Sequence, residues 1–133
     1  MFLNLRNNKK LWVSLFWGWM ALIIVLTAMP YNPDHIVKDR DYWVRPDYLE
    51  HISFYIILAL LFVPYFLNRG KSNSYFSLIL WVITGILFAA ITEFYQLYIP
   101  NRAFNYWDMF LNMGGILIGL LLGFYLFRSW EKG

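Results

Sequence analysis

Three segments of the chain carry ionisable and hydrogen-bonding side chains at helical spacing. In the first, Asp47, His51 and Tyr55 recur every four residues, which places them on one face of a helix. The other two segments contain Glu93 with Gln96, and Asn105 with Asp108 and Asn112. Carboxylates, an imidazole and amides in one place could bind a polar head group, or they could act as general acid and base.

The composition sets the environment in which these side chains must lie. Hydrophobic residues make up 60% of the 133 residues and charged residues 14%, whereas soluble domains have about 45–50% and about 25%. The mean hydropathy is +0.48. A soluble globule of this size could not bury so much apolar surface, so we predict an integral membrane protein. The sequence contains no cysteine, which excludes disulfides, thiolate metal sites and thiol catalysis.

The apolar segments predict an all-α membrane protein, a four-transmembrane-helix bundle that forms a single domain over residues 1–133. Each predicted span has about the 20 residues that a helix needs to cross the hydrocarbon core. The spans are residues 11–29, 51–67, 76–99 and 107–127.

The basic residues predict how the bundle is oriented. Seven of them precede the first span, lie between the second and third, or follow the fourth: Arg6, Lys9, Lys10, Arg69, Lys71, Arg128 and Lys132. Four lie in the other two loops: Lys38, Arg40, Arg45 and Arg102. By the positive-inside rule we expect both termini in the cytoplasm.

The polar residues of the three segments share one depth in this arrangement. With a rise of about 1.5 Å per residue, Glu93 and Asn112 each lie about 10 Å below the outer helix ends, and His51 about 6 Å below Asp47. An ionisable residue inside a span is costly and indicates function. We therefore predict a shared polar pocket that opens to the outside.

Structural roles compete with this interpretation. Asp47 with Glu50, and Asn105 with Asp108, have the spacing of helix caps. Glu93 requires a partner, which His51, Arg102 or Asn112 could supply, and a buried structural pair is an alternative to a site. The small residues Gly115, Gly119 and Gly123 allow close helix packing, either within the chain or in a homo-oligomer.

Other chemistries find little support in the sequence. There is no zinc-protease motif, serine-nucleophile motif, P-loop or dinucleotide-binding glycine motif. The available ligands for a metal are only His51, Glu93, Asp47 and Asp108, and we assign no metal and no cofactor from the sequence. There is no basic stripe that would bind nucleic acid.

The polar segments resemble the VanZ-like family, whose best-known member is associated with teicoplanin resistance. The resemblance covers about Met20 to Phe127. One departure is Tyr48, because a basic residue commonly follows the aspartate in this family. The matching pattern is Asp47-x3-His51-x3-Tyr55, Glu93-x2-Gln96, Pro100-x-Arg102, Asn105-x2-Asp108, Asn112-x2-Gly115 and Gly119.

The resemblance implies a multi-pass protein of the bacterial cytoplasmic (inner) membrane that acts at its outer face. We expect it to bind or modulate a membrane lipid, a lipid-linked cell-wall precursor or a lipoglycopeptide antibiotic, with Arg102 suited to an anionic group. The alternative is a membrane-embedded hydrolase or transferase with His51 and Glu93 as an acid/base pair. We favour binding, because the sequence offers no clear nucleophile. The expected ligand-binding residues are Asp47, His51, Tyr55, Glu93, Gln96, Arg102, Asn105, Asp108 and Asn112.

Overall fold

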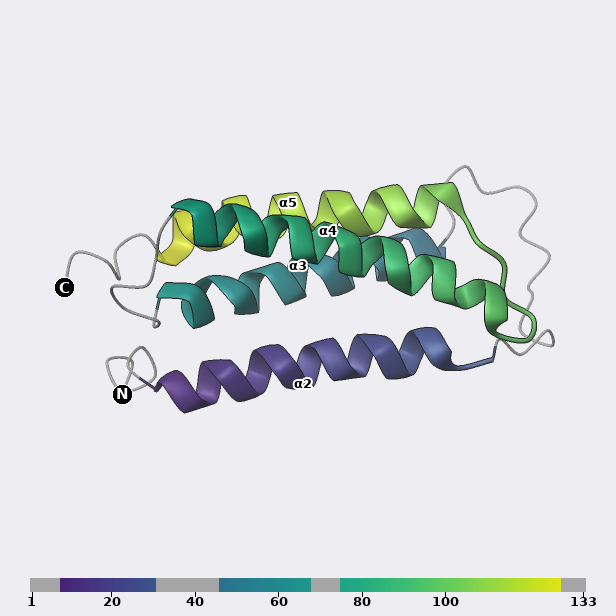
Figure 1. Ribbon diagram of the computed structural model, residues 1–133, viewed down its shortest axis with the longest axis horizontal. Helices are drawn as coiled ribbons and strands as arrows, with labels where there is room; N and C mark the ends of the chain where they lie inside the picture. The colour runs from purple at the N-terminus through teal and green to yellow at the C-terminus, as the bar shows by residue number, and fades with distance from the viewer. Residues whose placement is uncertain (1–7, 31–45, 68–74, 128–133) are drawn as a thin grey trace.

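The structure is a computed structural model that describes residues 8–30, 46–67 and 75–127 (Figure 1). These residues form four long helices, each apolar enough to cross a membrane, and the described part contains no strand. The all-helical prediction is therefore confirmed. The elements are α2 (Lys9–Ala28), α3 (Pro46–Leu67), α4 (Tyr75–Tyr95), the 3-10 helix η3 (Gln96–Tyr98) and α5 (Tyr106–Phe127).

Two helix boundaries differ from those predicted. Helix α3 begins at Pro46 rather than at His51, because a proline is well suited to the first turn of a helix, where its missing N–H costs nothing. Asp47 therefore lies in the first turn of α3, and not at the cap position that its spacing predicts. The third span is an α-helix only to Tyr95 and then tightens into η3.

The helices run alternately up and down, so that α2 begins and α5 ends at the same end of the bundle (Figure 1). At the other end lie the start of α3, η3, the segment 99–105 and the start of α5. We call this the Pro100 end. The predicted orientation in the membrane stays a prediction, and residues 31–45, with the aromatic residues of the first loop, lie outside the described residues.

Helices α3 and α5 form the tightest pair. A Cβ atom added to Gly119 would lie 2.5 Å from the carbonyl oxygen of Ile56, and one added to Gly115 would lie 2.6 Å from that of Ile52. Gly123 is similarly close to Val63, at 2.7 Å. The three glycines let the two backbones touch. This face of α5 packs against α3 within the chain, and a homo-oligomer stays a prediction.

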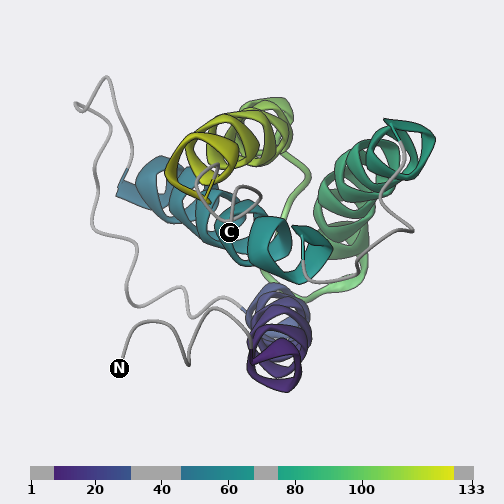
Figure 2. The same ribbon diagram turned by 90° about the vertical axis from the view of Figure 1, so that its left-hand side faces the viewer.

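Helices α2 and α4 flank this pair, and Figure 2 shows α2 standing apart from α5 on the other side of α3. They are joined to α3 largely by aromatic side chains. The Phe16 ring stacks on Tyr65 at 5.2 Å between centroids, and Phe62 lies 5.3 Å from Trp81. The Trp19 indole N–H also donates a hydrogen bond of 2.9 Å to the Phe54 carbonyl, which ties α2 to α3.

Candidate functional site

Polar side chains from three helices meet near the Pro100 end. His51 comes from α3, Glu93 from the last turn of α4 and Asp108 from the first turn of α5. One ligand atom of each lies within 4.8 Å of the other two. Glu93 is 0% exposed and Asp108 6%. The sequence analysis placed these residues at one depth, and the structure brings them into one group, which we call the polar cluster.

His51 is held by α5. Its Nδ1 lies 3.1 Å from Oδ1 of the buried Asn112, and its Nε2 lies 3.7 Å from Oδ2 of Asp108. Because a carbonyl oxygen can only accept, Nδ1 is the donor in the first contact. Asn112 therefore fixes the orientation of the ring, and Nε2 faces the Asp108 carboxylate.

Glu93 is held by two N–H groups that sequence reasoning did not pair with it. Its Oε2 accepts a hydrogen bond of 3.0 Å from Gln96 Nε2, and its Oε1 accepts one of 3.1 Å from the backbone N–H of Asn105. The predicted partners were His51, Arg102 and Asn112. Of these, His51 lies within the polar cluster but is not hydrogen-bonded to Glu93 among the contacts of the described residues. The carboxylate thus links the end of α4 to the start of α5.

The start of α5 explains how Asp108 reaches the cluster. Asn105 precedes the helix, and its Oδ1 accepts a hydrogen bond of 3.0 Å from the Trp107 N–H, which is the capping role that its spacing predicts. In a full capping box, Asp108 would bind the Asn105 N–H. Glu93 binds that N–H instead. The Asp108 carboxylate therefore turns toward His51.

Below the cluster, Tyr55 connects α3 to α4. Its hydroxyl is hydrogen-bonded to Thr92 Oγ1, which itself donates a 3.0 Å hydrogen bond to the Ala89 carbonyl. The Tyr55 hydroxyl is consequently the donor toward Thr92. Both side chains are buried. Thr92 was not among the predicted site residues, because a threonine in a transmembrane helix usually bonds its own backbone.

Arg102 lies at the edge of the cluster and contacts α2. It follows a turn in which the Arg102 N–H donates to the Ile99 carbonyl at 3.1 Å, with Pro100 and Asn101 as the central residues. Asn101 has a φ of 61°, a left-handed conformation that asparagine tolerates. The guanidinium donates from Nε to the Met29 carbonyl at 3.3 Å and from Nη2 to the Leu26 carbonyl at 3.4 Å. Arg102 therefore holds the C-terminal end of α2.

A small polar recess of about 80 Å³ opens beside these residues. It brings together four of the predicted residues, His51, Tyr55, Gln96 and Arg102, whereas Glu93, Asn105, Asp108 and Asn112 are not among its lining residues. Sequence reasoning missed the contribution of α2, whose apolar pattern carries no polar signal. Asp47 does not line the recess; it lies one turn before His51 on α3. The remaining lining residues are Ile23, Leu26, Thr27, Glu50 and Phe54.

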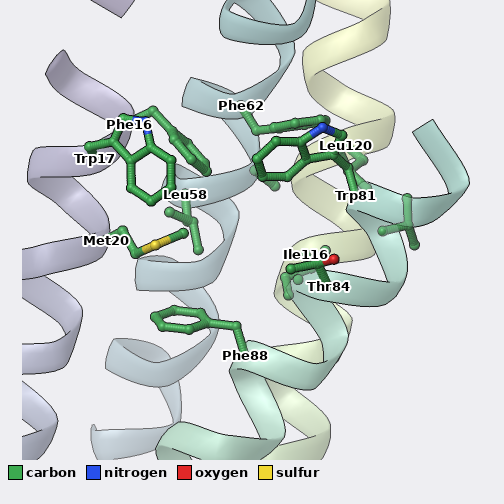
Figure 3. Close-up of a pocket in the computed structure, with 13 residues that line it drawn as sticks. Phe16, Trp17, Met20, Leu58, Phe62, Trp81, Thr84, Phe88, Ile116 and Leu120 are labelled. Carbon is green, nitrogen blue, oxygen red and sulfur yellow. The ribbon is translucent and has the colours of Figure 1, made fainter. Parts of the chain in front are cut away.

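A larger apolar cavity of about 320 Å³ lies deeper in the bundle (Figure 3). Side chains from all four helices point into it, including Met20 of α2, Leu58 of α3, Phe88 of α4 and Ile116 of α5. Its volume is at the lower end of the range for small-molecule sites, about 300–1,000 Å³. This cavity could not be predicted from the sequence, because most of its lining residues are the ordinary apolar residues of a membrane helix.

The fold and the site together define a class: a four-helix, multi-pass membrane protein with a buried polar cluster at one end of the bundle. A comparison of the sequence with known protein families identifies one family over almost the whole chain. Residues 10–128 match the VanZ/LLP1 family, and the chain belongs to that family. The resemblance seen in the polar segments is thus confirmed. No curated protein and no solved structure matches the chain.

Proposed function

We propose that this VanZ/LLP1 protein binds an amphiphile at the outer face of the bacterial cytoplasmic membrane. The ligand class is a lipid-linked envelope component, with a lipoglycopeptide as the second source of the same chemistry. The proposal rests chiefly on one observation: the polar recess and the apolar cavity are consecutive along the same two helices.

The two sets of lining residues are adjacent along each of these helices. On α2 the cavity ends at Met20 and the recess begins at Ile23; on α3 the recess ends at Tyr55 and the cavity begins at Leu58. Three residues correspond to about 4.5 Å along a helix. An acyl or prenyl chain in the cavity would therefore place its head group in the recess.

The recess favours a small anionic group. Its volume of about 80 Å³ admits a few heavy atoms, since one water occupies about 30 Å³ of liquid. Arg102 supplies the N–H donors that a phosphate or carboxylate needs, and Gln96 adds an amide. The cavity offers mainly apolar contacts to the remainder of the ligand.

Gly85 gives the sharpest test. A Cβ atom there would meet Ile116 Cδ1 at 3.5 Å, an ordinary contact, and Gly85 lines the cavity. We expect Gly85→Leu to fold normally and to lower binding at least tenfold. The matched control is Gly18→Leu on α2, where an added Cβ meets nothing within 4 Å. The measurement is native mass spectrometry of detergent-released protein with a polyprenyl-phosphate, a phospholipid and a lipoglycopeptide offered separately.

Offering the three ligands separately shows which chemical class the protein binds. Analysis of the products shows whether the bound ligand is also chemically changed. Equal binding of every ligand by the Gly85→Leu and Gly18→Leu variants would refute the proposal. A cleaved or transferred product would instead favour the alternative, a hydrolase or transferase that uses His51 and Glu93. His51 and Glu93 lie close together in the polar cluster, and this is the observation that favours the alternative.

The outward orientation has its own test. Seven basic residues against four favour both termini in the cytoplasm, and α2 begins at the end of the bundle where α5 ends (Figure 1). A reporter active only in the cytoplasm should work when fused after Gly133, and a periplasmic reporter should work within residues 31–45. The reverse pattern would place the polar recess on the inner side.

A further inference from the structure

The polar cluster contains a set of side chains suited to a metal ion. His51, Glu93 and Asp108 each bring one ligand atom to within 4.8 Å of the other two, and they come from three different helices. The sequence analysis assigned no metal because no ligand motif occurs along the chain. A site assembled from separate helices has no such motif.

The orientation of His51 is that of a metal ligand. Metal-bound imidazoles donate their second ring N–H to a carbonyl or carboxylate, which sets the tautomer. His51 Nδ1 donates in this way to Asn112 Oδ1 at 3.1 Å. In the neutral ring with its proton on Nδ1, Nε2 carries a lone pair, and it lies 3.7 Å from Asp108 Oδ2. A cation placed between these two acceptor atoms would be bound by both.

Glu93 is likewise fixed in the manner of a ligand carboxylate. Gln96 Nε2 donates to one oxygen and the Asn105 N–H to the other, at 3.0 and 3.1 Å. Each carboxylate oxygen has two lone pairs, so each retains one for a metal. Hydrogen bonds of this kind orient ligand carboxylates and tune the metal affinity.

We propose that His51, Glu93 and Asp108 bind a divalent transition-metal ion of the Zn²⁺ type. Two carboxylates and a neutral imidazole balance a charge of +2, and they combine the nitrogen and oxygen donors that such ions accept. Three protein ligands leave a coordination position for water or for an oxygen of a ligand. The proposal is independent of amphiphile binding.

The test is a metal titration of the full chain. The protein carries an affinity tag without histidine, is stripped with EDTA in detergent and is then titrated with Zn²⁺ and with Mn²⁺ by calorimetry. We expect one Zn²⁺ per chain. His51→Gln and Asp108→Asn should each weaken Zn²⁺ binding at least tenfold, and Asn112→Leu by about 10–100-fold. The chain has two histidines, so His35→Gln is the matched control and should bind as the wild type does.

A second measurement needs no variant. Zn²⁺ should raise the melting temperature of the wild-type protein, because a ligand of the folded state stabilises it. X-ray absorption of the bound zinc should show one imidazole among oxygen ligands. Absence of stoichiometric binding of either ion, or unchanged Zn²⁺ binding in His51→Gln, would overturn the metal site. Since the titration contains no added amphiphile, its failure would leave the function proposed above intact.

Discussion

Helices α3 and α5 differ from α2 and α4 in how they are packed. Of the most apolar stretch of each helix, 39% is buried in α3 and 33% in α5, but only 11% in each of α2 and α4. Glycines bring α3 and α5 into backbone contact, whereas α2 and α4 meet them through large side chains with a cavity of about 320 Å³ between. We call α3 and α5 the scaffold pair and α2 and α4 the wall helices, although all four helices contribute residues to the cavity lining.

The polar residues are also divided between the two pairs of helices. His51 belongs to α3, and its direct partners Asn112 and Asp108 belong to α5. The core of the polar cluster is thus built on the scaffold pair. Glu93 and Arg102 attach the walls to it, since one links α4 to the start of α5 and the other reaches α2.

The largest expected effect comes from separating the scaffold pair. In Gly119→Ala the new methyl group would lie 2.5 Å from the Ile56 carbonyl oxygen and 2.7 Å from Ala59 Cβ, so the backbones must move apart. We expect a loss of about 3 kcal/mol or more of stability, measured as a lower melting temperature in detergent. The control is Gly114→Ala, where the methyl meets nothing within 4 Å. If the two variants have the same melting temperature, the close contact between α3 and α5 does not determine the stability of the bundle.

Much of the fold could be predicted from the sequence, because a membrane-spanning helix is recognisable as a long, mostly apolar segment. The existence of each helix, the common depth of the polar residues and the capping role of Asn105 all followed from local patterns. The start of α3 at Pro46 did not, because the predicted apolar span begins at His51 and the spacing of Asp47 and Glu50 predicted Asp47 as the cap rather than a first-turn residue.

The pairings within the site were beyond the sequence for a physical reason. The depth of a residue follows from its position along a helix, but its partners depend on the rotation of each helix about its own axis. Glu93 therefore accepts a hydrogen bond from the Asn105 backbone N–H, and not from the side chains predicted as its partners. The acceptors of Arg102 are carbonyl groups of α2. Every residue has a carbonyl, so nothing in the sequence marks these two.

A medium effect is expected from cutting the link between α4 and the scaffold. Glu93→Ala removes the acceptor of two N–H groups, one on Asn105 and one on the buried Gln96. Hydrogen bonds between membrane helices are worth about 0.6–2 kcal/mol each, so we expect a loss of about 2 kcal/mol in thermal unfolding. Glu50→Ala, an exposed residue at the recess, is the control and should change the melting temperature little. Equal melting of the two variants would show that Glu93 is dispensable to the fold.

The smallest change in stability is expected at Arg102, which holds a wall rather than the scaffold. Its guanidinium donates through two nitrogens to the last carbonyls of α2. Lysine keeps the charge but loses the planar fork that reaches both acceptors. Arg102→Lys should therefore cost at most about 1 kcal/mol. It should still impair binding of an anionic amphiphile, because the recess would lose both a bidentate donor and the fixed end of α2.

Spin labels can separate this loosening from general destabilisation. The chain has no cysteine, so introduced cysteines are labelled selectively. Val25 of α2, Ile57 of α3 and Leu117 of α5 all have exposed side chains. In Arg102→Lys we expect the distance distribution between Val25 and Leu117 to broaden, while that between Ile57 and Leu117 stays as in the wild type. Broadening of both would mean that Arg102 supports the whole bundle. If neither pair broadens and binding is still lost, Arg102 acts on the ligand directly and α2 is held by its contacts with α3, including the hydrogen bond from Trp19 to Phe54.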